Sequence, residues 1–296
     1  MTPTAGAGGE PQWDGVLVRF GEIGIKSSPV RRQMLERLRQ NLLDQLVRRG
    51  LEGDVRTEGS RLWMEGPDAP ALAYAATQTF GVVSASPARR VAPTLEATVG
   101  AAPALALLRP WTRFAIRARR DGKHAFTSQD VAVQAGSAVH VAATAAGRKP
   151  VVDLERPELE LHVDVRQDRA FLFLDSLPGP GGLPVGSQGK VLARLADRDD
   201  ALAAWMMLRR GCHVAPGGTV DAKLAAHLAG WGLSPARAGP FAEAAAHWHA
   251  IAASCGDRLP HAPSDLGTDL PVLRPLYGLD LEEAARWMRA SGLAEA

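Results

Sequence analysis

The sequence predicts a chain of two fold classes, α+β over its first two thirds and α/β over the remainder. Short segments that alternate polar and apolar residues, typical of strands, recur between residues 13 and 175, and several are adjacent in pairs. Segments with apolar residues every third or fourth position, typical of helices, separate them. A Gly- and Pro-rich segment at 178–184 then precedes a region dominated by predicted helices. The length of 296 residues corresponds to two domains, or to three small ones.

The composition is that of a globular protein without membrane segments. Hydrophobic residues make up 46% of the chain and charged residues 22%, which excludes disordered and collagen-like chains. No apolar run approaches the roughly 20 residues of a membrane span, and no basic segment followed by an apolar stretch opens the chain. Cys212 and Cys255 are too few for a disulfide framework or a four-ligand zinc site. We therefore expect a cytoplasmic protein with no membrane contact; its net charge of +2 alone does not predict a nucleic-acid partner.

The first predicted domain spans residues 13–86, after a small, polar tail at 1–12 that we expect to be disordered. Its predicted elements are a strand at 13–20, a helix at 28–50, a hairpin at 54–65, a helix at 68–80 and a short strand at 82–85. Ser28-Pro29 is a typical helix start, and Gly50 a typical helix end. The order strand-helix-strand-strand-helix-strand is typical of a ferredoxin-like domain.

Two further regions follow, at 87–177 and, beyond the linker 178–184, at 185–296. In the former, we predict helices at 94–108 and 127–147, a strand at 111–119 and a hairpin at 159–175. In the latter, we predict strands at 191–195 and 270–273, and helices at 200–211, 222–230, 235–254 and from residue 280.

Four segments, in this order, resemble one family. They are RFGEIGIKS at 19–27, RARRDGKHAF at 117–126, GGLPVGSQGKVL at 181–192 and LRPLYGLD at 273–280. Together they resemble the ThiI-type tRNA 4-thiouridine synthetases. The resemblance implies a ferredoxin-like domain, a THUMP domain that binds the acceptor stem and 3′ end of tRNA, and a Rossmann-like PP-loop domain. In active family members the last domain adenylates a uridine and inserts sulfur.

Basic residues are the candidates for RNA contact. Arg113, Arg117 and Arg119 share one face of the strand predicted at 111–119, which suits either phosphate contacts or a solvated surface. The resemblance to this family favours phosphate contacts with RNA over a solvated surface. The residues expected to contact it are Lys26, Arg31, Arg32, Arg117, Arg119, Arg120, Lys123 and His124.

The candidate nucleotide loop departs from the family pattern Ser-Gly-Gly-x-Asp-Ser. Aligned with it are residues 195–200, in which Ala196 and Asp197 replace glycines, Asp200 replaces the closing serine and only Asp199 is retained. Glycines let backbone N–H groups approach a pyrophosphate, whereas three carboxylates repel it. We therefore expect no ATP cradle and no catalytic residue; the three aspartates are expected on a solvated helix N-terminus rather than around Mg²⁺.

Other motifs predict no further chemistry. Gly186–Lys190 is not a Walker A loop, because Pro184 and Val191 occupy required Gly and Ser/Thr positions. His247 and His249 lie two residues apart on a predicted helix and cannot share a metal ion. The region 185–296 is also shorter than the family's PP-loop domain, and we expect no rhodanese domain in this protein.

The favoured interpretation is a tRNA-binding ThiI/THUMP protein without sulfurtransferase activity of its own and without a cofactor. One alternative is a divergent ATP- and Mg²⁺-dependent tRNA sulfurtransferase that acts with a partner. Another is a scaffold whose C-terminal domain recruits a catalytic subunit to tRNA. Formation of a homodimer stays open.

Overall fold

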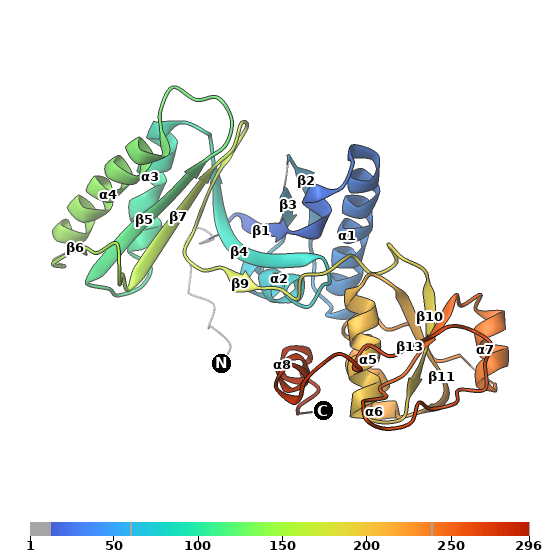
Figure 1. The fold of residues 1–296 in the computed structure, drawn as a ribbon. Coiled ribbons are helices and arrows are strands. Elements are labelled where there is room, and N and C mark those ends of the chain that lie inside the picture. Colours follow the sequence, from blue (N-terminus) through green and yellow to red (C-terminus); the bar gives the residue numbers. More distant parts are fainter. Residues whose placement is uncertain (1–12, 60, 238, 296) are drawn as a thin grey trace. The chain divides into compact units, whose positions relative to one another are not determined.

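The computed structural model describes residues 13–59, 61–237 and 239–295, so the tail predicted at 1–12 lies outside the described residues. The chain forms two compact units (Figure 1). The described part of the first unit comprises residues 13–17, 63–73 and 85–177. The second unit comprises residues 18–62, 74–84 and 178 onward.

The N-terminal elements follow the predicted ferredoxin-like order. They are β1 (Gly15–Phe20), the 3₁₀ helix η1 (Glu22–Ile25), α1 (Ser28–Arg48), β2 (Asp54–Glu58), β3 (Arg61–Glu65), α2 (Ala69–Ala76) and β4 (Val82–Val91). The strand predicted at 82–85 is too short, because β4 continues to Val91 by pairing with a later strand through Arg89 and Arg90. Pro87 and the two arginines interrupt the alternation that would have revealed this extension.

The next elements confirm the strands and helices predicted between residues 90 and 175. They are α3 (Leu95–Ala106), β5 (Arg113–Arg120), α4 (Ser128–Ala145), β6 (Val151–Val152), β7 (Leu159–Val165), β8 (Ala170–Phe173) and β9 (Leu177–Pro178). Two of these elements, the short strands β6 and β9, were not predicted. A capping box between Thr127 and Asp130 begins α4. The strand order of this mixed sheet is β2-β3-β1-β4-β8-β7-β5-β6, with β9 on β4. β5 runs parallel to β7, from Phe114 opposite Leu159 to Arg120 opposite Val165.

The C-terminal part is a Rossmann-like parallel sheet with helices. Its elements are β10 (Lys190–Leu195), α5 (Arg198–Arg209), β11 (His213–Val220), α6 (Ala222–Ala229), α7 (Phe241–His247), β12 (Ala252–Ser254), β13 (Val272–Leu273) and α8 (Leu281–Ser291). The sheet order is β11-β10-β12-β13, and the pairs are parallel. The short β12 therefore lies inside this sheet, between β10 and β13.

Two predictions in this part are wrong. The helix predicted at 235–254 is instead α7 followed by β12, because pairing of Ala252–Ser254 with β10 outweighs the helix propensity of an Ala-rich run. The chain leaves α7 at His249, whose φ of 55° is left-handed. Strand β11 is absent from the predicted elements, since Pro216, Gly217 and Gly218 conceal its apolar pattern.

Segment 178–184 makes defined hydrogen bonds within the second unit. The Gly181 N–H donates to the Val82 carbonyl and the Gly81 N–H to the Gly181 carbonyl, each at 2.8 Å. The Leu183 N–H donates to the Arg209 carbonyl at 2.9 Å. These contacts fix the path of the chain into β10.

The core of the second unit contains an aromatic cluster. Phe80, which follows α2, lies 5.2 Å from the Trp205 ring and 5.3 Å from the Trp231 ring, centroid to centroid. Phe80 is only 1% exposed, so its ring is part of the hydrophobic core formed by α5, α6 and β10. None of the described helices has the length and apolar character needed to cross a membrane.

Candidate functional site

A basic turn follows β5 in the first unit. Its shape depends on Gly122, whose φ is +107° and whose missing Cβ would lie 2.5 Å from the Gln167 side-chain oxygen. That oxygen accepts a hydrogen bond from the Lys123 N–H at 3.0 Å, and the Asp121 N–H donates to the Val165 carbonyl. The turn between β5 and α4 is thus held against the β7–β8 turn.

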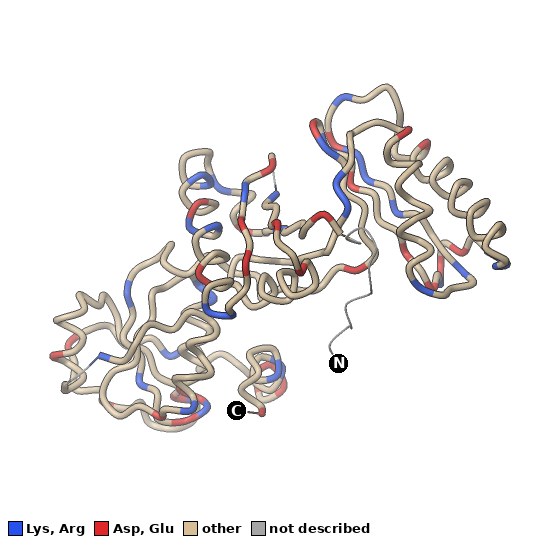
Figure 2. Tube along the Cα trace, turned by 180° about the vertical axis from the view of Figure 1, so that it is seen from behind, with Lys and Arg blue, Asp and Glu red and all other residues tan. Residues whose placement is uncertain are grey.

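The basic side chains at this turn face solvent. Arg119, Arg120 and Lys123 are all exposed. Within the described ranges, the side chains of Arg119 and Lys123 have no hydrogen-bond or ion-pair partner, and Arg120 donates only to the Gly122 carbonyl at 2.9 Å. The one carboxylate in the turn, Asp121, is paired with Arg166 at 2.9 Å. Figure 2 shows the basic positions of this unit gathered on its strands and few on its helices.

Arg117, on the same strand, is placed differently. Its guanidinium bonds Glu160 at 2.8 Å and the Leu154 carbonyl at 2.7 Å. Arg113 is likewise paired, with Glu158 at 3.2 Å. Of the three arginines predicted on one strand face, Arg113 and Arg117 are therefore paired with glutamates. Arg119 has no such partner among the described residues. RNA contact by Arg117 stays a prediction.

His124 completes the predicted motif. Its ring is half-buried and lies 5.3 Å from the Phe126 ring. Its Nε2 is buried and makes no hydrogen bond within the described part of the chain. The structure thus gives His124 a packing contact, and its RNA contact stays a prediction.

The other predicted RNA contacts lie in the second unit. Lys26 follows η1, and Arg31 and Arg32 are exposed at the start of α1, whose first turn contains no acidic residue. The N–H groups of a helix N-terminus also attract anions. This group lies on the second unit, and the turn after β5 lies on the first unit.

The candidate nucleotide loop joins β10 to α5, and the carboxylate of Asp200 lies within it. Asp200 is fully buried, so its predicted place on a solvated helix terminus is wrong. Its carboxylate accepts hydrogen bonds from the N–H groups of Ala196 at 3.0 Å and Gly256 at 2.7 Å, and from Arg194 at 2.7 Å. Asp197 is solvated as predicted and caps α5 by accepting from the Asp200 N–H at 2.9 Å. Two N–H groups of this strand-to-helix turn, those of Ala196 and Asp200, are thus bound by side-chain carboxylates.

Gly256 makes this arrangement of hydrogen bonds around the Asp200 carboxylate possible. A Cβ at this position would clash with the backbone of Asp199 and Asp200, so only glycine lets its N–H approach the Asp200 carboxylate. Asp199 itself points elsewhere and forms a two-point ion pair with Arg258, at 2.6 and 2.7 Å. Each of the two neighbouring carboxylates therefore has its own arginine.

The charged network extends across the carboxyl ends of the strands. Asp257 accepts from Arg194 at 3.1 Å, Arg274 at 3.0 Å and the Ser264 hydroxyl at 2.7 Å. Burial acts to raise the pKa of Asp257, but hydrogen bonds, those from Ser264 foremost, outweigh it and hold this pKa well below its usual range. The hydrogen bond to Asp200 raises the pKa of Arg194. Asp257 and Arg194 therefore both carry their charge at neutral pH.

The sequence did not reveal most of this network. Arg274 belongs to the family-like segment at 273–280, but Arg194, Asp257, Arg258 and Ser264 lie in no recognisable motif. They meet because parallel strands bring their carboxyl ends to one edge of the sheet, which is where ligands bind in such folds.

The described residues contain no group of three or more His, Cys, Asp or Glu side chains able to hold a metal ion. Cys255 is fully buried beside the network, and burial raises the pKa of its thiol. Burial likewise raises the pKa of Cys212.

Comparison with known families identifies both N-terminal domains. The ThiI ferredoxin-like domain family matches residues 15–86, and the THUMP domain family matches residues 90–175. These matches confirm the resemblance seen in the sequence segments.

Curated relatives extend the match. The chain is 44% identical to a probable tRNA sulfurtransferase of Halobacterium salinarum over 70% of this chain and 53% of that protein. It is 33% identical to a tRNA sulfurtransferase of Pyrobaculum aerophilum over 95% of this chain and 67% of that protein. The chain thus spans about half the length of several curated relatives that it matches.

Two solved structures share the fold. A Pyrococcus horikoshii protein superposes with a TM-score of 0.80 at 23% identity, over 94% of this chain and 99% of that one. A 4-thiouridine synthetase, solved as a complex with RNA and bound ATP, gives 0.76 at 20% identity, over 96% of this chain and 86% of that one. The likeness confirms the predicted ferredoxin-like, THUMP and Rossmann-like architecture.

The buried carboxylate of Asp200 leads to a prediction about stability. Asp200→Ala leaves two N–H groups and Arg194 without their shared acceptor, so we expect a loss of about 3–5 kcal/mol in the free energy of unfolding. Asp199→Ala removes a partly exposed ion pair and is expected to lose about 1 kcal/mol or less. Urea denaturation of both variants and the wild type measures the difference, and equal losses would contradict the inward role of Asp200.

Proposed function

The chain belongs to the tRNA sulfurtransferase family of ThiI type, and on this basis we propose that it binds the acceptor stem and 3′ end of tRNA. The observation that carries the proposal is the exposed basic turn after β5. It lies inside the residues matched by the THUMP family, and its carboxylate is already neutralised by Arg166. We assign the ferredoxin-like domain to residues 13–86, the THUMP domain to 87–177 and the PP-loop-like domain to 185–296, with 178–184 as the connection.

The proposed contacts are to phosphates. Guanidinium and ammonium groups without internal partners lose no protein interaction when they bind an RNA backbone, and they release counterions on doing so. Within the basic turn, Arg119 and Lys123 meet this condition, and Arg120 donates only to the Gly122 carbonyl. Arg31 and Arg32 offer a second set at the start of α1.

We further propose that the loop 195–200 does not bind the phosphates of ATP. A phosphate at this turn would have to displace a carboxylate that holds two N–H groups and an arginine. It would also meet the exposed carboxylate of Asp197, and a like charge at about 4 Å opposes binding by ~4 kcal/mol at an effective dielectric of 20. The residues present therefore do not fit the nucleotide.

A second candidate function is favoured by the names of the relatives. They are called tRNA sulfurtransferases, and Asp199 stands where the family pattern has its aspartate. In this alternative the chain is a divergent sulfurtransferase that completes its site with a partner. ATP binding discriminates the two candidates.

The basic turn generates the first binding prediction. The triple variant Arg119→Ala, Arg120→Ala and Lys123→Ala is expected to bind all tRNAs more weakly, and about equally so. The slope of log affinity against log salt is expected to flatten by about 0.9 for each phosphate that the variant no longer neutralises. Filter binding over a salt series measures both, with Arg113→Ala, an arginine of β5 already paired with Glu158, as the control. Unchanged affinity of the triple variant at about 0.15 M salt would contradict the assignment.

The recognised end of tRNA is tested separately. A minihelix that keeps the acceptor stem and the CCA end is expected to compete with full-length tRNA, because the proposed contacts concern that end alone. A blunt RNA duplex of equal length is the control, since it offers the same phosphates without the 3′ end. Equal competition by the two RNAs would refute recognition of the 3′ end while leaving phosphate binding intact.

The loop 195–200 leads to a prediction about ATP binding. Calorimetry with Mg²⁺ is expected to detect no saturable ATP binding in the millimolar range, and no pyrophosphate is expected to be released when tRNA is added. The physical reason is the internal carboxylate described above. A saturable isotherm that disappears in Asp199→Ala would instead establish the sulfurtransferase candidate.

A further inference from the structure

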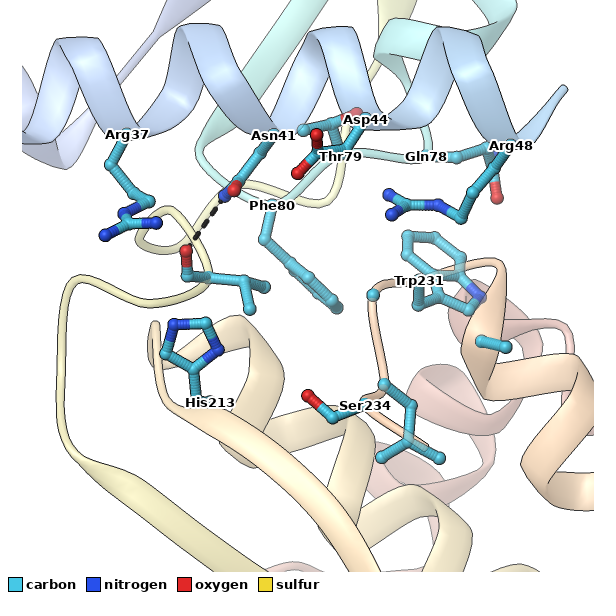
Figure 3. Close-up of a pocket in the computed structure, with 14 residues that line it drawn as sticks. Arg37, Asn41, Asp44, Arg48, Gln78, Thr79, Phe80, His213, Trp231 and Ser234 are labelled. Atoms are coloured by element: carbon cyan, nitrogen blue, oxygen red, sulfur yellow. Dashed lines mark hydrogen bonds between the residues drawn. The ribbon is translucent and has the colours of Figure 1, made fainter. Parts of the chain in front are cut away.

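A cavity of about 320 Å³ lies within the second unit, away from the loop 195–200 (Figure 3). One wall is α1, which contributes Arg37, Asn41, Asp44 and Arg48. These residues are spaced by four, three and four positions and so share one face of the helix. The facing wall comes from the start of β11 and the segment after α6. The volume lies at the lower end of the range for small-molecule sites.

One end of the cavity is rich in hydrogen-bond donors. Figure 3 shows Arg37, Asn41 and His213 gathered there. Arg37 is exposed, and its guanidinium makes no hydrogen bond or ion pair with any residue in the described ranges. Asn41 donates one amide hydrogen to the Val185 carbonyl at 3.0 Å, which leaves its second hydrogen for a ligand.

His213 adds a polar edge in positive surroundings. Burial lowers the pKa of its imidazole, and the nearby charges of Arg37 and Lys190 lower it further. The ring is therefore neutral at pH 7 and offers one N–H donor. A bound anion would relieve the positive field that these side chains create.

The remaining lining residues contain little negative charge that would repel an anion, and they supply apolar surface. Asp44 is the one acidic residue of the described lining, and it already accepts from Gln40 at 2.9 Å. Arg48 is already bound to Gln45 at 2.7 Å. Figure 3 shows the Phe80 ring between the two polar ends, and Leu233 also lines the cavity. A ligand that fits must therefore combine an oxyanion with an apolar body.

We propose that this cavity binds a small organic oxyanion, with Arg37 as the two-point anchor of its phosphate or carboxylate group. A free guanidinium fork suits either group geometrically. The apolar body of the ligand lies against Leu233, which keeps 8% of its surface exposed. This site uses neither the basic turn nor the loop 195–200, so its existence is independent of the proposed tRNA binding.

Calorimetry with phenyl phosphate and with benzoate tests the proposal on the full chain, without RNA. At least one of the two is expected to bind saturably, and the tighter of them identifies the oxyanion. Phenol, which has the same ring without the charged group, is expected not to bind. Arg37→Gln is expected to weaken binding about tenfold or more, because it removes a charge-assisted two-point hydrogen bond.

Arg39→Gln is the matched control. Arg39 lies on α1 two positions later, is absent from the lining and is paired with Glu36 at 2.7 Å, so its loss is expected to leave the affinity unchanged. The imidazole signal of His213, assigned as the one missing from His213→Gln, is expected to shift on binding. Absence of saturable binding by both oxyanions, equal binding of phenol, or equal effects of Arg37→Gln and Arg39→Gln would each overturn the proposal.

Discussion

The C-terminal domain depends on one buried ion pair, between the Asp200 carboxylate and the Arg194 guanidinium. A fully buried carboxylate is strongly unfavourable unless charge and hydrogen bonds surround it. Here two backbone N–H groups and Arg194 do so, and Arg194 in turn reaches Asp257, which Arg274 and Ser264 also bind. The loop after β10, the strand ends of β12 and β13 and the start of α5 are therefore fixed by a single connected set of charges. A hydroxyl at position 200 has a shorter reach and no charge, so it could not replace this set.

The molecule uses its arginines in two ways. Arg117, Arg194, Arg258 and Arg274 bind acids of the same chain and contribute to its structure. Arg31, Arg32 and Arg119 have no such acid among the described residues and present their charge to solvent. Because internal pairing removes one acid for each base, a net charge of +2 conceals local surfaces that are strongly basic. What distinguishes the two groups is the position of the nearest carboxylate, not the residue type.

The sequence predicted well what short-range pattern determines. The ferredoxin-like order, the helix predicted from residue 127 and the hairpin predicted at 159–175 follow from periodicity and caps, and the structure confirms them. Partners distant in the chain decided the failures: β10 makes a strand of the Ala-rich segment 252–254, and β8 lengthens β4. The candidate site divides in the same way. The sequence at 195–200 showed that the glycines of the family pattern are replaced. The burial of the Asp200 carboxylate was not predictable, because it depends on a hydrogen bond from Gly256, 56 positions later.

The position of Phe80 affects how the chain can be divided. The ferredoxin-like family match ends at residue 86, yet the ring that follows α2 is covered by Trp205 and Trp231, which belong to the next domain along the chain. A fragment that ends before residue 178 keeps Phe80 but loses both indole rings, and it turns a core residue into an exposed apolar one. The residues that the family model matches and the residues that enclose this ring are therefore different lengths of this polypeptide.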